Sequence, residues 1–499
     1  MDFFYFYKSM FFANDILFFL PEIYLTCLVI ISLLVGTFIT AMFANIAIIS
    51  FGWFTLYLLC LLLYVGAQLP VHDYFLLGYQ YLSDPLNYTF KGVLLLFLII
   101  ILYTSMGYFF HERIFFLEYF FFIGFFILSA FFLLSANDFS LFYVVIELQA
   151  LILYTLATLK RYNIFSAESG LKYFVLGAFS SGLLLFGISL FYGFAGLLNF
   201  YEMRFLNIVS CEGLTYYGFS FALVFILVAF LFKMAGAPFH IWVPDVYEGS
   251  PTPVVLFFAV LPKLAIIIFL IRFYVLFLSE MPAIWHISFF TSGILSVLWG
   301  TFAGLNQFNI KRLYAYSAIV NVGYLLLVLS YGTIENLASV INYLLPYLLA
   351  TCSVFFVILL FRKLDGRKIR SLVDYRFFFS YNTLFAGLFS LVFFSLAGIP
   401  PLVGFFTKFF LFKSLFTLDL MATSLVFVVL IISTVSAFYY IRVVRFTFFT
   451  TLRFPIFFLE LDMVASFLFV AIVFFLILFV LIQPLVLVSS YNLVCLVSL

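Results

Sequence analysis

Runs of about twenty apolar residues, separated by short polar breaks, recur along nearly the whole chain. An α-helix needs a run of that length to cross the hydrocarbon core of a bilayer. Hydrophobic residues make up 67% of the 499 positions and charged residues only 9%, against roughly 25% charged residues in a soluble domain. The sequence therefore predicts an all-α integral membrane protein with about fourteen transmembrane helices.

The polar breaks give the positions of the predicted spans. They lie at 16–38, 43–66, 90–110, 114–134, 139–159, 167–195, 217–247, 253–279, 283–305, 311–332, 336–361, 380–417, 420–447 and 463–489. The seventh and the twelfth are too long for one straight span, and each has proline in its middle. Proline removes a backbone hydrogen bond that lipid cannot replace. We therefore expect both helices to be broken, at Pro238 and at Pro400 and Pro401.

Lysine and arginine are unevenly divided between the two sides of these spans. Loops on one side hold little beyond Lys8, Arg204 and Arg272. Loops after odd-numbered spans hold Arg113, Lys160, Arg161, Lys311, Arg312, Arg362, Lys363, Arg367, Lys368, Arg370, Arg376, Arg442, Arg445 and Arg453. Basic loops are retained on the inner side of a membrane. The alternation favours an even number of helices, with both termini on the outer face.

A few ionisable residues remain inside the predicted spans. They are Glu147, Lys172, Lys233, Lys263, Lys408 and Lys413. Such residues are costly in hydrocarbon and typically mark ion or substrate pathways. Lys172 and Lys413 are expected to reach the interface along their aliphatic stems. Glu147 lies near mid-membrane, where it is either half of an ion pair with Lys233 or a structural carboxylate hydrogen-bonded to a neighbouring helix.

The two interrupted helices share a pattern next to a lysine. Lys233 precedes Ala235-Gly236-Ala237-Pro238, and Lys408 follows Ala397-Gly398-Ile399-Pro400. Paired broken segments in the two halves of a membrane protein indicate an internal repeat with a transport site. A buried lysine with a movable carboxylate partner can load and release a proton near neutral pH. Lys263, directly after Pro262 in the eighth span, extends this set.

Other chemistry finds little support in the sequence. The five cysteines, Cys27, Cys60, Cys211, Cys352 and Cys495, are far apart, and the four histidines are equally dispersed, so neither a zinc site nor an iron–sulfur site is expected. There is no glycine-rich nucleotide motif, and the net charge of +2 predicts no nucleic-acid partner. His240 follows Lys233 by seven residues and is either part of an ion path or a structural histidine.

Several long motifs resemble a known family. They are "SANDFSLFYVVIELQALILYTLATL", "AESGLKYFVLGAFSSGLLLFGISLFYG", "FKMAGAPFHIWVPDVYEGSPTPV" with "PKLA", "NQFNIKRLYAYSAIVNVGY" and "SLAGIPPLVGFFTKF". Together they are similar to the antiporter-like subunit 2 family of respiratory complex I, NADH:ubiquinone oxidoreductase. The resemblance runs from about residue 118 to 445. Shorter pieces also occur in sister antiporter-like subunits and in Mrp-type cation/proton antiporters.

The resemblance implies a fold of two inverted five-helix repeats, each with a broken helix. It implies N-terminal helices over 1–113, a first repeat over 114–279, a second over 280–447 and a C-terminal helix over 448–499. The proton-transfer residues of the family carry over onto Glu147, Lys233, Lys263 and Lys408. Asn321 stands where many relatives have histidine, and because asparagine cannot take up a proton at neutral pH, this departure puts a titrating role there in doubt.

The implied function is proton translocation by a non-redox membrane-arm subunit, coupled to NADH:ubiquinone electron transfer. FMN, iron–sulfur clusters and ubiquinone would lie in other subunits, and the partners would be other membrane-arm subunits and membrane lipids. The implied location is the mitochondrial inner membrane with both termini toward the intermembrane space, or else a bacterial inner membrane. Two other functions stay open, a stand-alone or Mrp-type antiporter and a membrane scaffold without transport.

Overall fold

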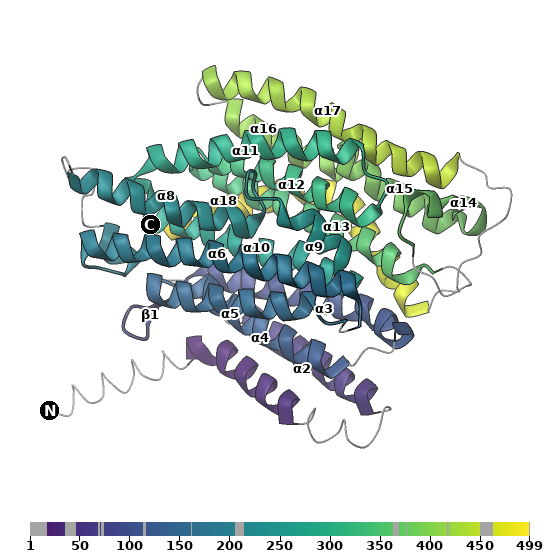
Figure 1. The fold of residues 1–499 in the computed structure, drawn as a ribbon, viewed down its shortest axis with the longest axis horizontal. Coiled ribbons are helices and arrows are strands. Elements are labelled where there is room, and N and C mark those ends of the chain that lie inside the picture. The colour runs from purple at the N-terminus through teal and green to yellow at the C-terminus, as the bar shows by residue number, and fades with distance from the viewer. Residues whose placement is uncertain are drawn as a thin grey trace.

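Long helices that run side by side form a single bundle in the computed structural model (Figure 1). The structure describes residues 17–34, 46–67, 70, 74–112, 116–160, 162–204, 214–362, 369–376, 378–416, 418, 420–449 and 463–498. Among these residues, twelve helices are long and apolar enough to cross a membrane, and Phe54–Ala67 and Thr383–Ala397 are shorter apolar helices. The predicted all-α membrane class is confirmed, and the count of fourteen stays a prediction.

The element bounds follow the predicted spans closely. In chain order the described elements are the helix Leu17–Leu34, α2 (Ile46–Ala67), β1 (Tyr74–Leu76), β2 (Tyr81–Ser83), α3 (Pro85–Glu112), α4 (Phe116–Ser135), α5 (Phe139–Ala157), α6 (Ile164–Ala195), α7 (Phe200–Met203), α8 (Leu214–Met234), α9 (Trp242–Gly249), α10 (Thr252–Leu276), η3 (Leu278–Glu280), α11 (Pro282–Leu305), α12 (Ile310–Leu329), α13 (Ile334–Leu360), η4 (Leu372–Tyr375), α14 (Phe378–Tyr381), α15 (Thr383–Ala397), α16 (Val403–Phe416), α17 (Leu420–Phe448) and α18 (Met463–Ser498). The short antiparallel hairpin β1–β2 was not predicted.

Three helices form the core of the bundle. Every residue in the most apolar stretch of α10 is buried, and α12 and α13 are also largely buried. A helix that is apolar all round is stable only inside protein or lipid, and α10 is covered by α3, α4, α8, α13 and α18. Figure 1 shows α10 in the middle of the bundle. Charged residues on α10 are therefore shielded from lipid and from bulk solvent.

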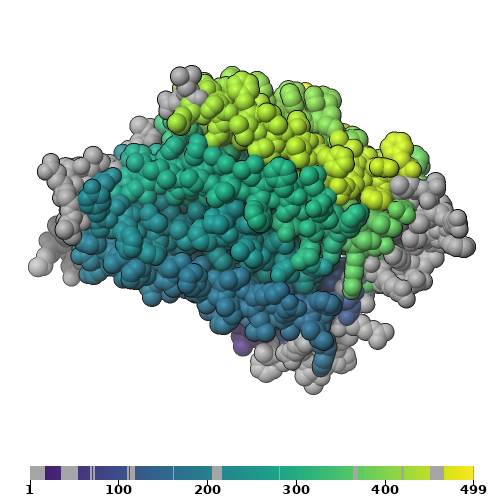
Figure 2. All heavy atoms as spheres, turned by 45° about the horizontal axis from the view of Figure 1, so that its top comes forward, coloured from purple at the N-terminus to yellow at the C-terminus, as the bar shows by residue number. Residues whose placement is uncertain are grey.

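The outer helices turn apolar side chains outward. Phe174 and Phe179 on α6, Trp299 on α11 and Phe427 on α17 are exposed, as is expected of surfaces that face lipid. On the face shown in Figure 2, the chain runs from blue at one edge through teal and green to yellow-green at the other. The two halves of the chain therefore lie next to each other.

Both predicted helix breaks are present, and both end in the same backbone motif. The chain turns left-handed at Ala235 after α8 (φ 67°) and at Gly398 after α15 (φ 86°). After α8, Gly236 N–H donates to the carbonyl of Leu231 at 2.8 Å, and after α15, Ile399 N–H donates to that of Phe394 at 3.1 Å. This pairing is a Schellman C-cap. It satisfies carbonyls that lipid would leave unpaired.

The sequence alignment of the two breaks is corrected by one residue. Ala235 was expected to correspond to Ala397, but the shared left-handed position pairs Ala235 with Gly398. Pro238 then corresponds to Pro401 rather than to Pro400. The four-letter similarity was misleading because the residue with positive φ is an alanine, Ala235, in the first break and a glycine, Gly398, in the second. Glycine adopts this backbone conformation more readily than alanine.

Candidate functional site

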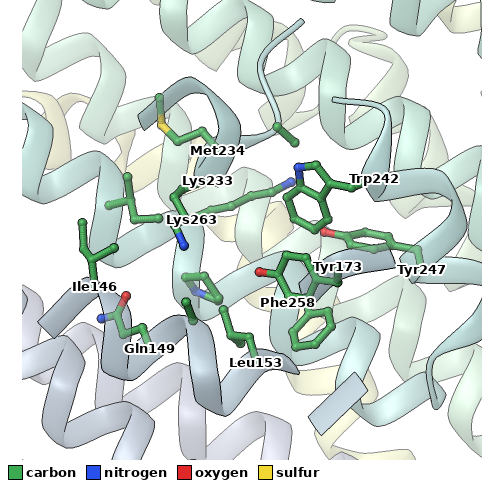
Figure 3. Close-up of a pocket in the computed structure, with 14 residues that line it drawn as sticks. Ile146, Gln149, Leu153, Tyr173, Lys233, Met234, Trp242, Tyr247, Phe258 and Lys263 are labelled. Atoms are coloured by element: carbon green, nitrogen blue, oxygen red, sulfur yellow. The ribbon is translucent and has the colours of Figure 1, made fainter. Parts of the chain in front are cut away.

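Lys233 and Lys263 line one cavity between α5, α6, α8, α9 and α10 (Figure 3). Gln149, Tyr173 and Trp242 line it too, and the Trp242 indole N–H donates to the carbonyl of Phe232 at 3.1 Å. This hydrogen bond ties α9 back to the last turn of α8. The break thus gives a cavity with two ammonium groups in the interior of the bundle.

Lys233 occupies the last turn of α8, two residues before left-handed Ala235. The C-terminal end of a helix carries partial negative charge from its unpaired carbonyls, and a cation there is stabilised. The break therefore offers Lys233 electrostatic compensation that a continuous helix would not supply.

Lys263 lies on the largely buried α10 and is 5% exposed. Its ammonium has no hydrogen-bond partner in the described part of the protein, although it lies 6.0 Å from the centre of the Tyr347 ring. Pro262 precedes it and has no N–H, so the carbonyl of Phe258 lacks its usual hydrogen bond within the helix. Phe258 also lines the cavity. A buried ammonium without a partner is unfavourable unless water reaches it.

Glu147 on α5 does not form the expected direct ion pair. Its Oε1 is buried and has no hydrogen-bond partner, and among the described residues no contact within 4.0 Å joins it to Lys233. It nevertheless lies on α5, the helix whose neighbouring residues Ile146 and Gln149 line the cavity of Lys233. Coupling between this carboxylate and the ammonium would therefore need a bridging water.

Lys408 follows the second break in the chain, and its side chain reaches back across the break to the end of α15. It lies on α16, and its ammonium donates to the carbonyls of Leu396 at 2.9 Å and Ala397 at 3.3 Å, at the C-terminus of α15. It also lies 5.7 Å from the centre of the Tyr324 ring. Lys233 and Lys408 therefore both lie at the negative end of a half-helix, although one precedes its break and the other follows it.

Tyr347 on α13 connects the two halves of the site. Its ring faces Lys263, and it lines a second cavity together with Lys408, Tyr343 and Thr407. The Tyr347 hydroxyl is buried without a hydrogen-bond partner in the described structure. Sequence reasoning missed Tyr347 because a tyrosine in an apolar run gives no sign of which side chains it will meet.

Asn321 and His240 lie near this path but not at its centre. The Asn321 Oδ1 accepts a hydrogen bond of 2.8 Å from Tyr343, so the asparagine orients a tyrosine of the second cavity. His240, between α8 and α9, is 6% exposed and packs edge-on against Trp299 at 5.8 Å. It does not line the cavity that contains Lys233 and Lys263.

A second group of buried charges was missed altogether. Lys91 donates to Glu22 at 2.6 Å and to the Tyr81 hydroxyl at 2.7 Å, and all three residues are 0% exposed. Nearby, Arg272 on α10 pairs with Asp84 at 3.2 Å and also binds the carbonyl of Leu134. The expectation that Arg272 lies in an outer loop is therefore wrong. Its carboxylate partner lies about 190 residues earlier in the chain, a pairing that no local pattern indicates.

The two lysines that were expected to reach the interface, Lys172 and Lys413, are exposed. Lys172 is 44% exposed and pairs with Glu168 at 2.8 Å and Asp245 at 2.9 Å. Arg312 contacts Asp245 at 2.8 Å from α12, so α6, α9 and α12 meet at one ion-pair network.

Comparisons with known proteins show which proteins this chain is similar to. The model of the family "NADH:quinone oxidoreductase/Mrp antiporter, TM" matches residues 136–436. The chain is 37% identical over 495 residues to NADH-ubiquinone oxidoreductase chain 2 of Marchantia polymorpha, covering 97% of this chain and 99% of that protein. It is 38% identical over 368 residues to NADH-quinone oxidoreductase subunit N 1 of Rhizobium meliloti, covering 74% and 76%.

Solved structures share the fold. A chain of respiratory complex I from Thermus thermophilus superposes with a TM-score of 0.76 and 27% identity, covering 94% of this chain and 99% of that one. A chain of the Mrp complex from Dietzia sp. gives a TM-score of 0.78 at 16% identity, with 97% and 98% covered. At that identity the second likeness shows the fold alone.

Proposed function

The chain belongs to the NADH:quinone oxidoreductase/Mrp antiporter transmembrane family, and we propose that it is a proton-translocating membrane-arm subunit of complex I. Its own residues would move protons while FMN, iron–sulfur clusters and ubiquinone lie in partner subunits. The two helix breaks support the division into repeats over 114–279 and 280–447. Relatives of both mitochondrial and bacterial type support either inner membrane. The distribution of lysine and arginine between the loops supports placing both termini on the outer face.

One observation carries the proposal: Lys263 and Lys408, from the two halves of the chain, both face Tyr347 or a cavity that it lines. Glu147 would tune Lys233, Lys233 would share its cavity with Lys263, and Lys263 would relay charge past Tyr347 to Lys408. Like charges repel by roughly 1–2 kcal/mol at about 10 Å and an effective dielectric near 20. A proton that arrives at Lys263 would thus favour release of the one on Lys408.

The proposal is tested by replacing Lys263 with alanine in the intact complex. We expect proton pumping and coupled quinone reduction to fall while the complex still assembles, because the relay loses its central charge. The matched control is Lys413→Ala, which removes an exposed lysine and should leave pumping unchanged. Full pumping by an assembled Lys263→Ala complex would overturn the relay.

An Mrp-type or stand-alone antiporter is the second candidate. The identities of 37% and 38% to complex I subunits, against 16% to the Mrp chain, favour the first. Isolation from native membranes separates them. A complex I subunit should co-purify with a large NADH-oxidising assembly, whereas an antiporter should exchange cations for protons without NADH.

A further inference from the structure

A polar cavity lies at the basic end of the bundle, apart from the cavities of the proposed proton path. Lys160, Lys311, Arg362 and Arg370 line it. Lys160 follows α5, Lys311 lies in the first turn of α12, and Arg362 follows α13. Segments far apart in the sequence therefore bring four cations to one cavity.

Arg362 is the buried member of this group, at 5% exposure. One of its nitrogens, Nη1, donates to Glu112 at 3.1 Å, and the guanidinium lies 5.4 Å from the centre of the Tyr108 ring. The other, Nη2, is buried with no hydrogen-bond partner in the described structure. A buried donor on a charged group is costly to leave unpaired. An acceptor that enters the cavity would satisfy it.

The surroundings of Arg362 favour an anion. The cavity has four cations in its lining, and among the described residues the carboxylates that contact or line this group are Glu112, Glu248 and Asp374, which leaves a net charge of 4 − 3 = +1. The N-terminus of α10 also opens onto it through Pro251 and Thr252, and no side chain caps that helix. Uncapped helix N-termini bind anions through free N–H groups and the helix dipole.

We propose that this cavity is a binding site for a phosphate group, supplied by a phospholipid headgroup or by free phosphate. Arg362 would donate from Nη2, the first turn of α10 would donate backbone N–H groups, and Arg370 would add charge at the cavity. Arginine suits this role because its planar fork matches phosphate oxygens. The site does not depend on the proposed proton path and would exist in a complex that does not pump.

The test uses the purified complex that contains this chain, reconstituted in phosphatidylcholine nanodiscs. One arm titrates inorganic phosphate, and the other replaces part of the lipid with cardiolipin. Thermal stability and a cryo-electron microscopy map are measured in both arms. We expect density beside Arg362 and a higher unfolding temperature in at least one arm. A response to cardiolipin alone assigns the ligand to lipid, and a response to phosphate alone assigns it to the soluble ion.

Four variants make the result specific. Arg362→Gln should weaken the apparent affinity by roughly tenfold to a hundredfold. Glu112→Gln removes a competing carboxylate and should tighten binding, a gain that a purely structural role would not produce. Arg445→Gln removes an exposed cation from α17 and should change nothing. If the complex with Arg362→Gln fails to assemble, the affinities of Arg370→Gln and Glu112→Gln still test the site. Arg370→Gln should bind more weakly than wild type, and Glu112→Gln should bind more tightly. Absence of binding in both arms, or equal binding by wild type and the cavity variants, would overturn the site.

Discussion

The ammonium of Lys408 donates a hydrogen bond of 2.9 Å to the carbonyl oxygen of Leu396, across the break between α15 and α16. The interaction joins two half-helices that share no continuous backbone ladder. It also means that the charge on Lys408 and the geometry of the break depend on each other. A change of protonation at Lys408 would loosen its hold on the end of α15.

Lys408→Arg and Lys408→Gln should therefore both depress proton pumping, for different reasons. Arginine keeps its charge at any accessible pH, so it can hold the carbonyls but cannot release a proton. Glutamine can neither carry charge nor compensate the end of α15, and should also cost about 1.5–3 kcal/mol of local stability. Pumping by reconstituted complex and hydrogen exchange of α15 amides measure the two effects. Wild-type pumping by the arginine variant would remove deprotonation of Lys408 from the mechanism.

The second break also depends on a glycine. A Cβ built on Gly404 would overlap the carbonyl oxygen of Ser395, whereas one built on Gly387 in α15 meets nothing within 4 Å. Gly404→Ala should destabilise the region by about 1–3 kcal/mol or prevent assembly, since the overlapping atom is backbone and cannot rotate away. Gly387→Ala is the matched control and should assemble normally. Equal assembly of the two variants, seen on native gels, would contradict this packing.

The ion-pair network at α9 predicts a pH dependence of stability. Burial alone would raise the pKa of Asp245, but hydrogen bonds from Lys172 and Arg312 offset it and hold the pKa below its ordinary value. A carboxyl whose pKa is lower in the folded state contributes stability above its unfolded-state pKa and loses it as pH falls through the folded one. Asp245→Asn should therefore lower the unfolding temperature at neutral pH.

The difference in unfolding temperature between wild type and Asp245→Asn should shrink as the pH falls below about 4, the ordinary pKa of an aspartate, and through the lower folded-state pKa. Circular dichroism melts of the two proteins at matched pH values measure it. A difference in unfolding temperature that stays constant or widens with falling pH would show that the carboxylate of Asp245 does not stabilise the fold through its charge.

Part of the site could be predicted because its signals are local. Lys233 and Lys408 each stand near a proline break, and a charge and a helix breaker in the same apolar run are visible in the sequence. Other features depend on packing between distant helices. Tyr347 faces Lys263 only because α13 packs on α10, and no periodicity within either helix shows that register.

The missed charges have a similar explanation. Lys91 and Arg272 lie near predicted span ends, where a lysine or arginine is usually assigned to a loop. Each is instead buried because its carboxylate partner, Glu22 or Asp84, arrives from another helix or from the β1–β2 segment. Counting charges by side of the membrane cannot separate a solvated lysine from one that is paired inside the bundle.

Tyr347→Phe tests the connection between the two halves. The change removes the hydroxyl but keeps the ring that faces Lys263, so packing should persist while the second cavity loses a proton-conducting group. We expect slower proton pumping with normal assembly. Tyr119→Phe is the matched control, since it also removes a buried hydroxyl, from α4. Equal pumping by both variants in reconstituted vesicles would show that the Tyr347 hydroxyl carries no protons.

The Glu22–Lys91 pair calls for a double-mutant cycle. Both side chains are fully buried and 2.6 Å apart. Removing one partner leaves an uncompensated charge in a low dielectric, which costs about 3–5 kcal/mol. Glu22→Gln or Lys91→Met alone should therefore lower the unfolding temperature strongly. The double variant should recover most of the loss, because replacing both charges by neutral groups of similar volume is often nearly neutral.

Thermal unfolding of the four proteins gives the coupling energy, and their proton pumping shows whether the pair also acts in transport. Tyr81→Phe is a useful third change, since it removes the hydrogen bonds that the hydroxyl donates to Glu22 and accepts from Lys91 and leaves both charges in place. It should cost less than either single charge removal. If the single variants were as stable as wild type, water must reach this cluster and the charges are solvated. If their losses simply added in the double variant, the two residues would stabilise the bundle independently and the ion pair would contribute nothing.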